Sequence, residues 1–231
     1  MGIEKFVGSL ETNIGYKPDN IDLNDVCKYS FDTVLFDFNS LLYRSIQEMD
    51  KTLLSGTDVI QIYTNIFNYT MNIVINEVVK YCNKNHKVTN IGIFVDGVPY
   101  RPKMFEQKRR KYLSAFELML DGVNDNPTES TKKPSFKFSR NSISSSTRFM
   151  HQLALYLTEW KSINSSLFNI IHISLNNENG EGEHKIREFI INEKLSNLGN
   201  ICIYSPDGDV LLTSLLHDNI HIHVWRNIFD K

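Results

Sequence analysis

The stretch FNIIHISLNNENGEGEHK, residues 168–185, indicates the fold class of this chain. Its apolar, β-branched start predicts a buried strand over 168–173. Apolar residues at helical spacing follow from Ile186 to Leu195 and predict a helix. Glu181 and Glu183 therefore stand where a strand gives way to a helix, which is the edge at which open α/β sheets bind ligands. Two adjacent carboxylates there indicate either a bound cation or the solvated acidic start of a helix.

Three other apolar runs also end in carboxylates. The run 33–36 is followed by Asp37, the run 91–95 by Asp96, and the run 200–204 by Asp207 and Asp209. Compact apolar runs of this kind are typical of parallel strands that are buried on both faces. Since the carboxyl ends of parallel strands share one edge of a sheet, we expect all six acids to converge on one crevice.

The segments between these runs have helical spacing or turn composition. Helices are predicted over 3–11, 40–49, 57–81, 103–120 and 149–160, and a last strand over 220–225. Residues 122–146 are rich in Ser, Asn, Thr and Pro, and we expect a mobile loop there. Alternating strands and helices predict a doubly wound α/β fold with a mostly parallel sheet and helices on both faces. Residues 1–231 are expected to form a single domain.

Six carboxylates at one edge would repel one another strongly unless cations lay between them. Hard divalent cations prefer oxygen ligands, and two such ions about 4 Å apart can clamp a phosphodiester during in-line hydrolysis. We therefore expect two Mg²⁺ ions, for which Mn²⁺ can substitute, at this edge.

A basic segment follows shortly after Asp96. It contains Arg101, Lys103, Lys108, Arg109, Arg110 and Lys111, with Gln107 among them. On a helix, Lys103, Gln107 and Arg110 or Lys111 share one face. That face suits a terminal phosphate beside the predicted metals, whereas a solvated basic helix is the plainer alternative.

The overall composition sets limits on the function. The chain has 25 basic and 27 acidic residues, so nucleic acid would have to bind to a local patch. Its three cysteines are widely spaced, which argues against a disulfide framework and indicates a reducing compartment. The sequence contains no apolar run long enough to span a bilayer. We expect an intracellular protein of the cytoplasm, with a nuclear location left open.

Several segments together resemble one known family. They are Asp37-Phe38-Asn39, Val95-Asp96-Gly97-Val98, the basic block 101–111, Gly180-Glu181-Gly182-Glu183-His184-Lys185-Ile186 and Asp207-Gly208-Asp209. In order and spacing they resemble the N-terminal catalytic region of the XRN-type 5′→3′ exoribonucleases. The resemblance implies a PIN/FEN-like nuclease core that releases nucleoside 5′-monophosphates from single-stranded RNA with a 5′-monophosphate. It also implies Mg²⁺ ligands, which are Asp37, Asp96, Glu181, Glu183, Asp207 and Asp209. The substrate-binding residues that it implies are Lys103, Gln107, Arg110, Lys111, Tyr43 and Asn39.

The chain departs from the family pattern at three points. Tyr43 stands where a His normally stacks on the first base, and its ring can do the same. Lys111 stands where Arg is usual. The family has a further metal-site Asp in a downstream Gly-Asn-Asp segment, beyond the position of Lys231, so we expect that a partner chain could complete the site. A structure-specific DNA nuclease of the PIN/FEN-like class and a catalytically weakened RNA-binding domain are the alternatives.

Overall fold

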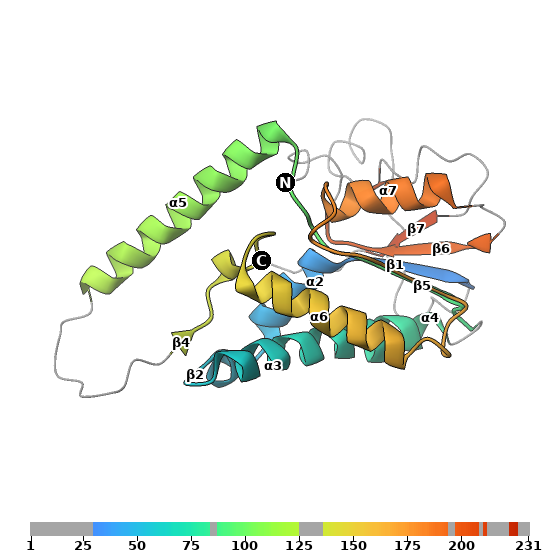
Figure 1. Cartoon of the computed structure of the whole chain (residues 1–231), viewed down its shortest axis with the longest axis horizontal. Helices are drawn as coiled ribbons and strands as arrows, with labels where there is room; N and C mark the ends of the chain where they lie inside the picture. Colours follow the sequence, from blue (N-terminus) through green and yellow to red (C-terminus); the bar gives the residue numbers. More distant parts are fainter. Residues whose placement is uncertain are drawn as a thin grey trace, which may run out of the picture.

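A five-stranded parallel sheet forms the centre of the protein (Figure 1). The computed structural model describes residues 30–83, 87–124, 136–193, 197–207, 210–211 and 222–225. The strand order is β5-β3-β1-β6-β7, and every neighbouring pair is parallel. The strands are β1 (Thr33–Asp37), β3 (Asn90–Phe94), β5 (Ile170–Ser174), β6 (Ile201–Tyr204) and β7 (Ile222–Trp225).

Helices cover both faces of this sheet. Figure 1 shows α7 on one face, and α2, α3, α4 and α6 on the other. Their bounds are α2 (Phe38–Glu48), α3 (Val59–Asn72), α4 (Lys80–Cys82), α6 (Arg148–Ile163) and α7 (Gly182–Asn192). α5 (Arg101–Asn124) extends away from the sheet as a long helix. The predicted fold class, a doubly wound α/β sheet, is confirmed.

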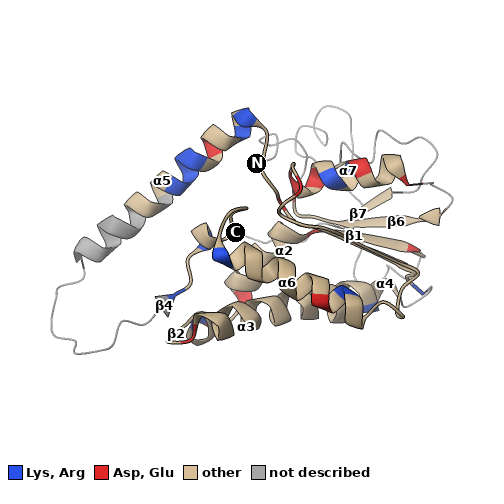
Figure 2. Cartoon of the chain, viewed as in Figure 1, with Lys and Arg blue, Asp and Glu red and all other residues tan. Residues whose placement is uncertain are grey.

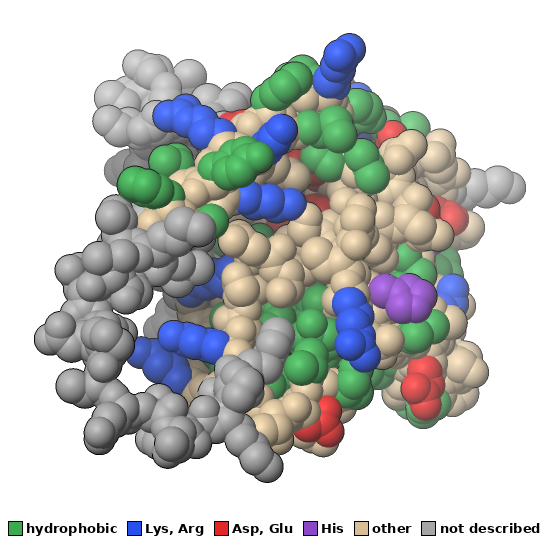
Figure 3. All heavy atoms as spheres, turned by 60° about the vertical axis from the view of Figure 1, so that its left-hand side comes forward, with side chains coloured by type: hydrophobic (Ala, Val, Ile, Leu, Met, Phe, Trp, Pro, Cys, Tyr) green, Lys and Arg blue, Asp and Glu red, His purple; other side chains and the backbone are tan. Residues whose placement is uncertain are grey.

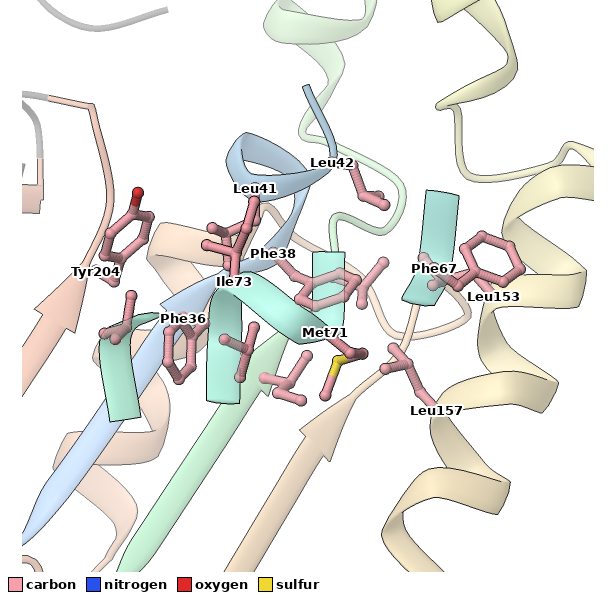
Figure 4. Packing of buried hydrophobic residues seen from close by; sticks show 14 of the residues in the cluster. Phe36, Phe38, Leu41, Leu42, Phe67, Met71, Ile73, Leu153, Leu157 and Tyr204 are labelled. Carbon is pink, nitrogen blue, oxygen red and sulfur yellow. The ribbon is translucent and has the colours of Figure 1, made fainter. Parts of the chain in front are cut away.

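Side chains of β1 alternate between two apolar clusters. Val34 and Phe36 pack among residues of α2, α3 and α6, whereas Leu35 packs against α7. Figure 4 shows Phe36 and Phe38 in the larger cluster, with side chains from the neighbouring helices around them. Because each fully buried Phe or Leu contributes about 1.5–3 kcal/mol, these two layers fix the register of β1 and the position of the acid that ends it.

The strand order reverses at β1. From β1 the chain crosses to β3 and β5 on one side, and α7 then returns it to β6 on the other side of β1. In open α/β sheets a crevice forms outside the carboxyl ends of the two strands that flank such a reversal. Here those ends carry Asp37 and Asp207.

Some elements differ from the sequence-based expectation. The helix expected over 57–81 is α3, followed by a π-helical stretch (Ile73–Val79) and by α4. Within the expected loop 122–146, α5 continues to Asn124, β4 (Phe136–Lys137) pairs with β2 (Ser55–Gly56), and the 3₁₀ helix η4 (Arg140–Ser142) follows. A further 3₁₀ helix, η2 (Lys51–Leu54), precedes β2. The helix expected over 3–11, and 125–135 of the expected loop, lie outside the described residues.

The described residues also bear on the expectations about the cysteines and about membrane-spanning segments. Cys82 and Cys202 are buried free thiols, and Cys27 lies outside the described residues. In the described ranges, no helix combines the length and the apolarity that a bilayer crossing requires.

Candidate active site

Carboxylates from four separate segments line one pocket at the carboxyl edge of the sheet. The pocket has a volume of about 590 Å³. The acids that line it are Asp37, Asp96, Glu181, Glu183 and Asp207. Figure 2 shows acidic residues at the start of α7 and basic residues along the first half of α5. The sixth predicted acid, Asp209, lies outside the described residues.

Asp37 ends β1 in the middle of this group. Its Oδ2 accepts a hydrogen bond of 2.9 Å from the buried Ser205 hydroxyl, which lies just after β6. Burial raises the pKa of Asp37 from 3.8 to about 7, and the charges of the neighbouring acids Asp96, Glu183 and Asp207 act in the same direction. The Ser205 hydrogen bond opposes this rise. The carboxyl group is therefore held where a negative charge is unfavourable without a compensating cation.

Asp96 is fixed by backbone and side-chain hydrogen bonds from two sides. Its Oδ1 accepts a bond of 2.7 Å from the backbone N–H of Gly182, and its own N–H donates to Asn39 Oδ1 at 3.2 Å. Burial raises the pKa of Asp96; the Gly182 hydrogen bond lowers it and the nearby Glu181 raises it. Asn39 was predicted to bind substrate, and it lines the pocket. The side-chain oxygen of Asn39, however, accepts the hydrogen bond from the Asp96 N–H and so helps to position Asp96.

Glycines permit the close approach of β3 to the start of α7. A Cβ on Gly182 would lie 3.1 Å from Asp37 Oδ1 and 3.1 Å from the Phe94 carbonyl oxygen. A Cβ on Gly97 would lie 1.6 Å from the Glu178 carbonyl oxygen, so no other residue fits there without moving the backbone. Gly180 has a φ of +99°, a conformation that L side chains rarely adopt. The Gly-Glu-Gly-Glu segment can therefore bring both glutamates to the end of β3.

Lys185 holds the same corner together from within. Its side chain is buried, and Nζ donates to the carbonyl oxygens of Val95 at 2.7 Å and Leu175 at 2.8 Å. Burial lowers the pKa of Lys185. These two bonds connect α7 to the ends of β3 and β5, and thereby position Asp96.

Lys103, in the first turn of α5, reaches the glutamates. Its Nζ forms an ion pair with Glu181 and lies 3.4 Å from Glu183 Oε1. Burial raises the pKa of Glu183, and the charge of Lys103 lowers it. His184 Nδ1 lies 3.6 Å from Glu183 Oε1, and together with Glu181 these two residues form a compact group of potential metal ligands. Lys103 was predicted to bind phosphate, and here its ammonium group lies on the acids.

The other predicted substrate residues lie further along the pocket. Gln107, Arg110 and Lys111 of α5 line it, as does Tyr43 of α2. Lys111 Nζ donates to Ser144 Oγ on the opposite wall. Figure 3 shows basic side chains beside a hollow in which acidic atoms are visible.

Sequence reasoning missed a whole wall of the pocket. The lining residues in question are Arg140, Asn141, Ile143, Ser144 and Ser145, together with Pro206. The first five lie in or just after η4, inside the Ser-rich segment that was read as a loop. No periodicity marks these residues, and only the contact between α5 and this wall reveals their role. Ser205 was also missed, because its importance depends on the distance to Asp37.

The donor set fits hard divalent cations. The carboxylates come from four segments and crowd into one buried edge, where burial and, to a smaller extent, the charges of the neighbouring acids raise the pKa of Asp37. Oxygen donors of this kind suit Mg²⁺ and Mn²⁺, whereas the thiolate ligands typical of structural zinc sites are not among the lining residues.

Comparisons with known proteins assign the chain to a family. Residues 1–228 match the family model described as XRN 5′-3′ exonuclease N-terminus. The human 5′-3′ exoribonuclease 1 is 30% identical over 212 residues, which cover 85% of this chain and 12% of the human protein. The 5′-3′ exoribonuclease 2 of Neurospora crassa is 29% identical, over 85% of this chain and 20% of its own length.

A third relative, the 5′-3′ exoribonuclease 1 of Schizosaccharomyces pombe, is 26% identical over 85% of this chain. The chain spans 15% of that relative, so it corresponds to a small part of each of these proteins. On the extent of the family match, the chain belongs to the XRN 5′-3′ exonuclease N-terminus family.

Proposed function

We propose that this chain is the nuclease domain of a Mg²⁺-dependent 5′→3′ exoribonuclease. It acts on single-stranded RNA with a 5′-monophosphate and releases nucleoside 5′-monophosphates. The observation that carries the proposal is the convergence of carboxylates from four segments with cationic side chains of α5 in one pocket. RNA as the substrate rests on the names of the relatives, which are exoribonucleases.

The acids would hold two divalent ions. Asp37, Asp96, Glu181, Glu183 and Asp207 line the pocket, and Asp209 follows in sequence. When bound, the ions would lower the pKa of a water molecule and neutralise charge on the scissile phosphate. The contribution of the chain itself is to fix the carboxylates: Ser205 orients Asp37, and the Gly182 N–H orients Asp96.

The remaining pocket residues would orient the RNA. Arg110, Lys111 and Gln107 line the pocket beyond Lys103 and offer donors to a terminal phosphate. Tyr43, which is 41% exposed, presents a ring on which the first base can stack. A phosphate at one end and the scissile bond at the other would make the enzyme remove one nucleotide at a time.

The catalytically weakened RNA-binding alternative is favoured by the contact between Lys103 and the two glutamates. The ammonium group of Lys103 contacts the carboxylates of Glu181 and Glu183, which a divalent ion would need as ligands. In the active form Lys103 must turn toward the phosphate. Residues of the longer relatives, or a partner chain, could favour that arrangement by completing the metal site.

The test is Mg²⁺-dependent release of mononucleotides from 5′-phosphorylated RNA, measured with Glu183→Gln and with Glu188→Gln as a matched control. Glu188 lies on the same helix and is exposed. We expect Glu183→Gln to abolish release and Glu188→Gln to leave it unchanged, with similar melting temperatures. Release that is equal in both variants would reject the proposed site. A DNA oligonucleotide of the same sequence, cleaved as fast as the RNA, would favour the DNA nuclease alternative.

A further inference from the structure

The wall of the pocket that faces α5 carries a cation of its own. Arg140, in η4, lines the same pocket as Arg110 of α5. The two walls touch, since Lys111 Nζ donates to Ser144 Oγ, four residues beyond Arg140. A cationic side chain therefore lies on each side of this part of the pocket.

Both arginines are exposed, and their charges are not neutralised locally. In the described part of the chain, ion pairs involve Arg44, Lys103 and His184, and neither Arg110 nor Arg140 takes part in one. Two unpaired guanidinium groups that line one pocket repel each other. A phosphate group between them would remove this repulsion, and each guanidinium can bind a phosphate through two parallel hydrogen bonds.

Tyr43 lines the pocket together with both arginines and Asp96. Burial raises the pKa of Tyr43 and so does Asp96, whereas Arg110 and Arg140 lower it. The Tyr43 hydroxyl therefore lies within electrostatic range of Asp96, Arg110 and Arg140. A nucleotide beside Tyr43 would therefore have both the Asp96 carboxylate and the two arginines within reach.

We infer that Arg140 is a second ligand of the terminal 5′-phosphate, which is held between Arg110 on α5 and Arg140 on the opposite wall. This inference rests on the proposed function and adds a specificity-determining residue to it. Arg140 selects RNA by its 5′ end, and the two-sided grip places the phosphate at a fixed distance from the acids. Lys103 contacts the acids in this structure and would join this grip only after turning toward the phosphate.

The test measures binding without cleavage. A single-stranded RNA, labelled at its 3′ end and carrying either a 5′-phosphate or a 5′-hydroxyl, is titrated with the full chain in EDTA at constant ionic strength. Fluorescence anisotropy gives the ratio of the two affinities. In Arg140→Gln we expect this ratio to fall by about tenfold or more, the loss typical of one charge-assisted contact. The affinity for the 5′-hydroxyl RNA should hardly change, and Arg140→Lys should give an intermediate ratio.

Two control variants remove the same charge elsewhere. Arg148 is exposed at the start of α6 and does not line the pocket, and Arg109 is exposed on α5 and does not line it either. Arg148→Gln and Arg109→Gln should lower the affinity for both RNAs slightly and equally, as a general electrostatic contribution does. Because all four positions are exposed, unchanged melting temperatures will show that the fold is retained.

The possible outcomes distinguish the inference about Arg140 from the proposed function. If Arg110→Gln lowers the ratio and Arg140→Gln does not, the inference is overturned and the proposed function stands. Equal losses on both RNAs in Arg140→Gln would also overturn it, since they would indicate a contact to an internal phosphate. A wild-type ratio near one would overturn both the inference and the proposed recognition of the 5′ end.

Discussion

Asp37→Asn should stabilise the protein in the absence of divalent ions. Asn keeps an acceptor for the Ser205 hydroxyl but carries no charge. In the native protein the pKa of Asp37 is raised from 3.8 to about 7. The folded state thus binds the proton more tightly than the unfolded state, and the free energy of unfolding falls as pH rises between these two values. Above pH 7 the loss amounts to about 4 kcal/mol as an upper bound, because the pKa of the neighbouring Asp96 and Glu183 is raised as well and the loss does not belong to Asp37 alone.

The assay is urea unfolding in EDTA at pH 4 and pH 8, with wild type and Asp37→Asn. We expect the variant to be more stable at pH 8 by up to about 4 kcal/mol, and the difference to be small at pH 4, where Asp37 is protonated in the folded state and close to its ordinary pKa of 3.8 in the unfolded state. Addition of Mg²⁺ at pH 8 should then stabilise wild type more than the variant, since the ion binds the native carboxylates. Asp58→Asn, which replaces an exposed helix-capping carboxylate by an amide that can still cap the helix, is the control and should change the stability at pH 8 little. If Asp37→Asn is less stable than wild type at pH 8 without metal, the reasoning that burial and neighbouring charges disfavour the Asp37 carboxylate is refuted.

Three further substitutions test separate contacts. Lys103→Gln should increase the rise in melting temperature that Mg²⁺ produces, because the ammonium no longer competes for the glutamates; a smaller rise would contradict this. Gly97→Ala should destabilise by about 3 kcal/mol or more in urea unfolding, because its Cβ would meet a backbone carbonyl; a change below about 1 kcal/mol would show that the loop adapts. Lys185→Met leaves the carbonyl groups of Val95 and Leu175 without their donor and should cost about 2 kcal/mol or more; an unchanged melting temperature would exclude its role in holding this corner.

The sheet and its acidic edge could be predicted because their signals are local. Each strand is a short apolar run, and Asp37, Asp96 and Asp207 stand at or within three residues of the ends of their strands, so the parallel topology brings them together.

The opposite wall of the pocket could not be predicted in this way. Arg140 and Ser144 lie in a polar, Ser-rich segment without periodicity, and their importance comes from facing α5 across the pocket. The same holds for Ser205, whose hydroxyl matters only because β6 lies beside β1. Lys103 shows a third limit: its helix face was predicted, but not its ion pair with Glu181, which depends on where α5 begins relative to α7.

The most direct test of the acidic centre is the release of nucleoside 5′-monophosphates from a 5′-phosphorylated single-stranded RNA as Mg²⁺ is titrated. We predict release from the 5′ end only, absent in EDTA and saturable with Mg²⁺. Asp207→Asn should abolish it without lowering the melting temperature. Release that persists in EDTA, or that Asp207→Asn leaves intact, would contradict the account.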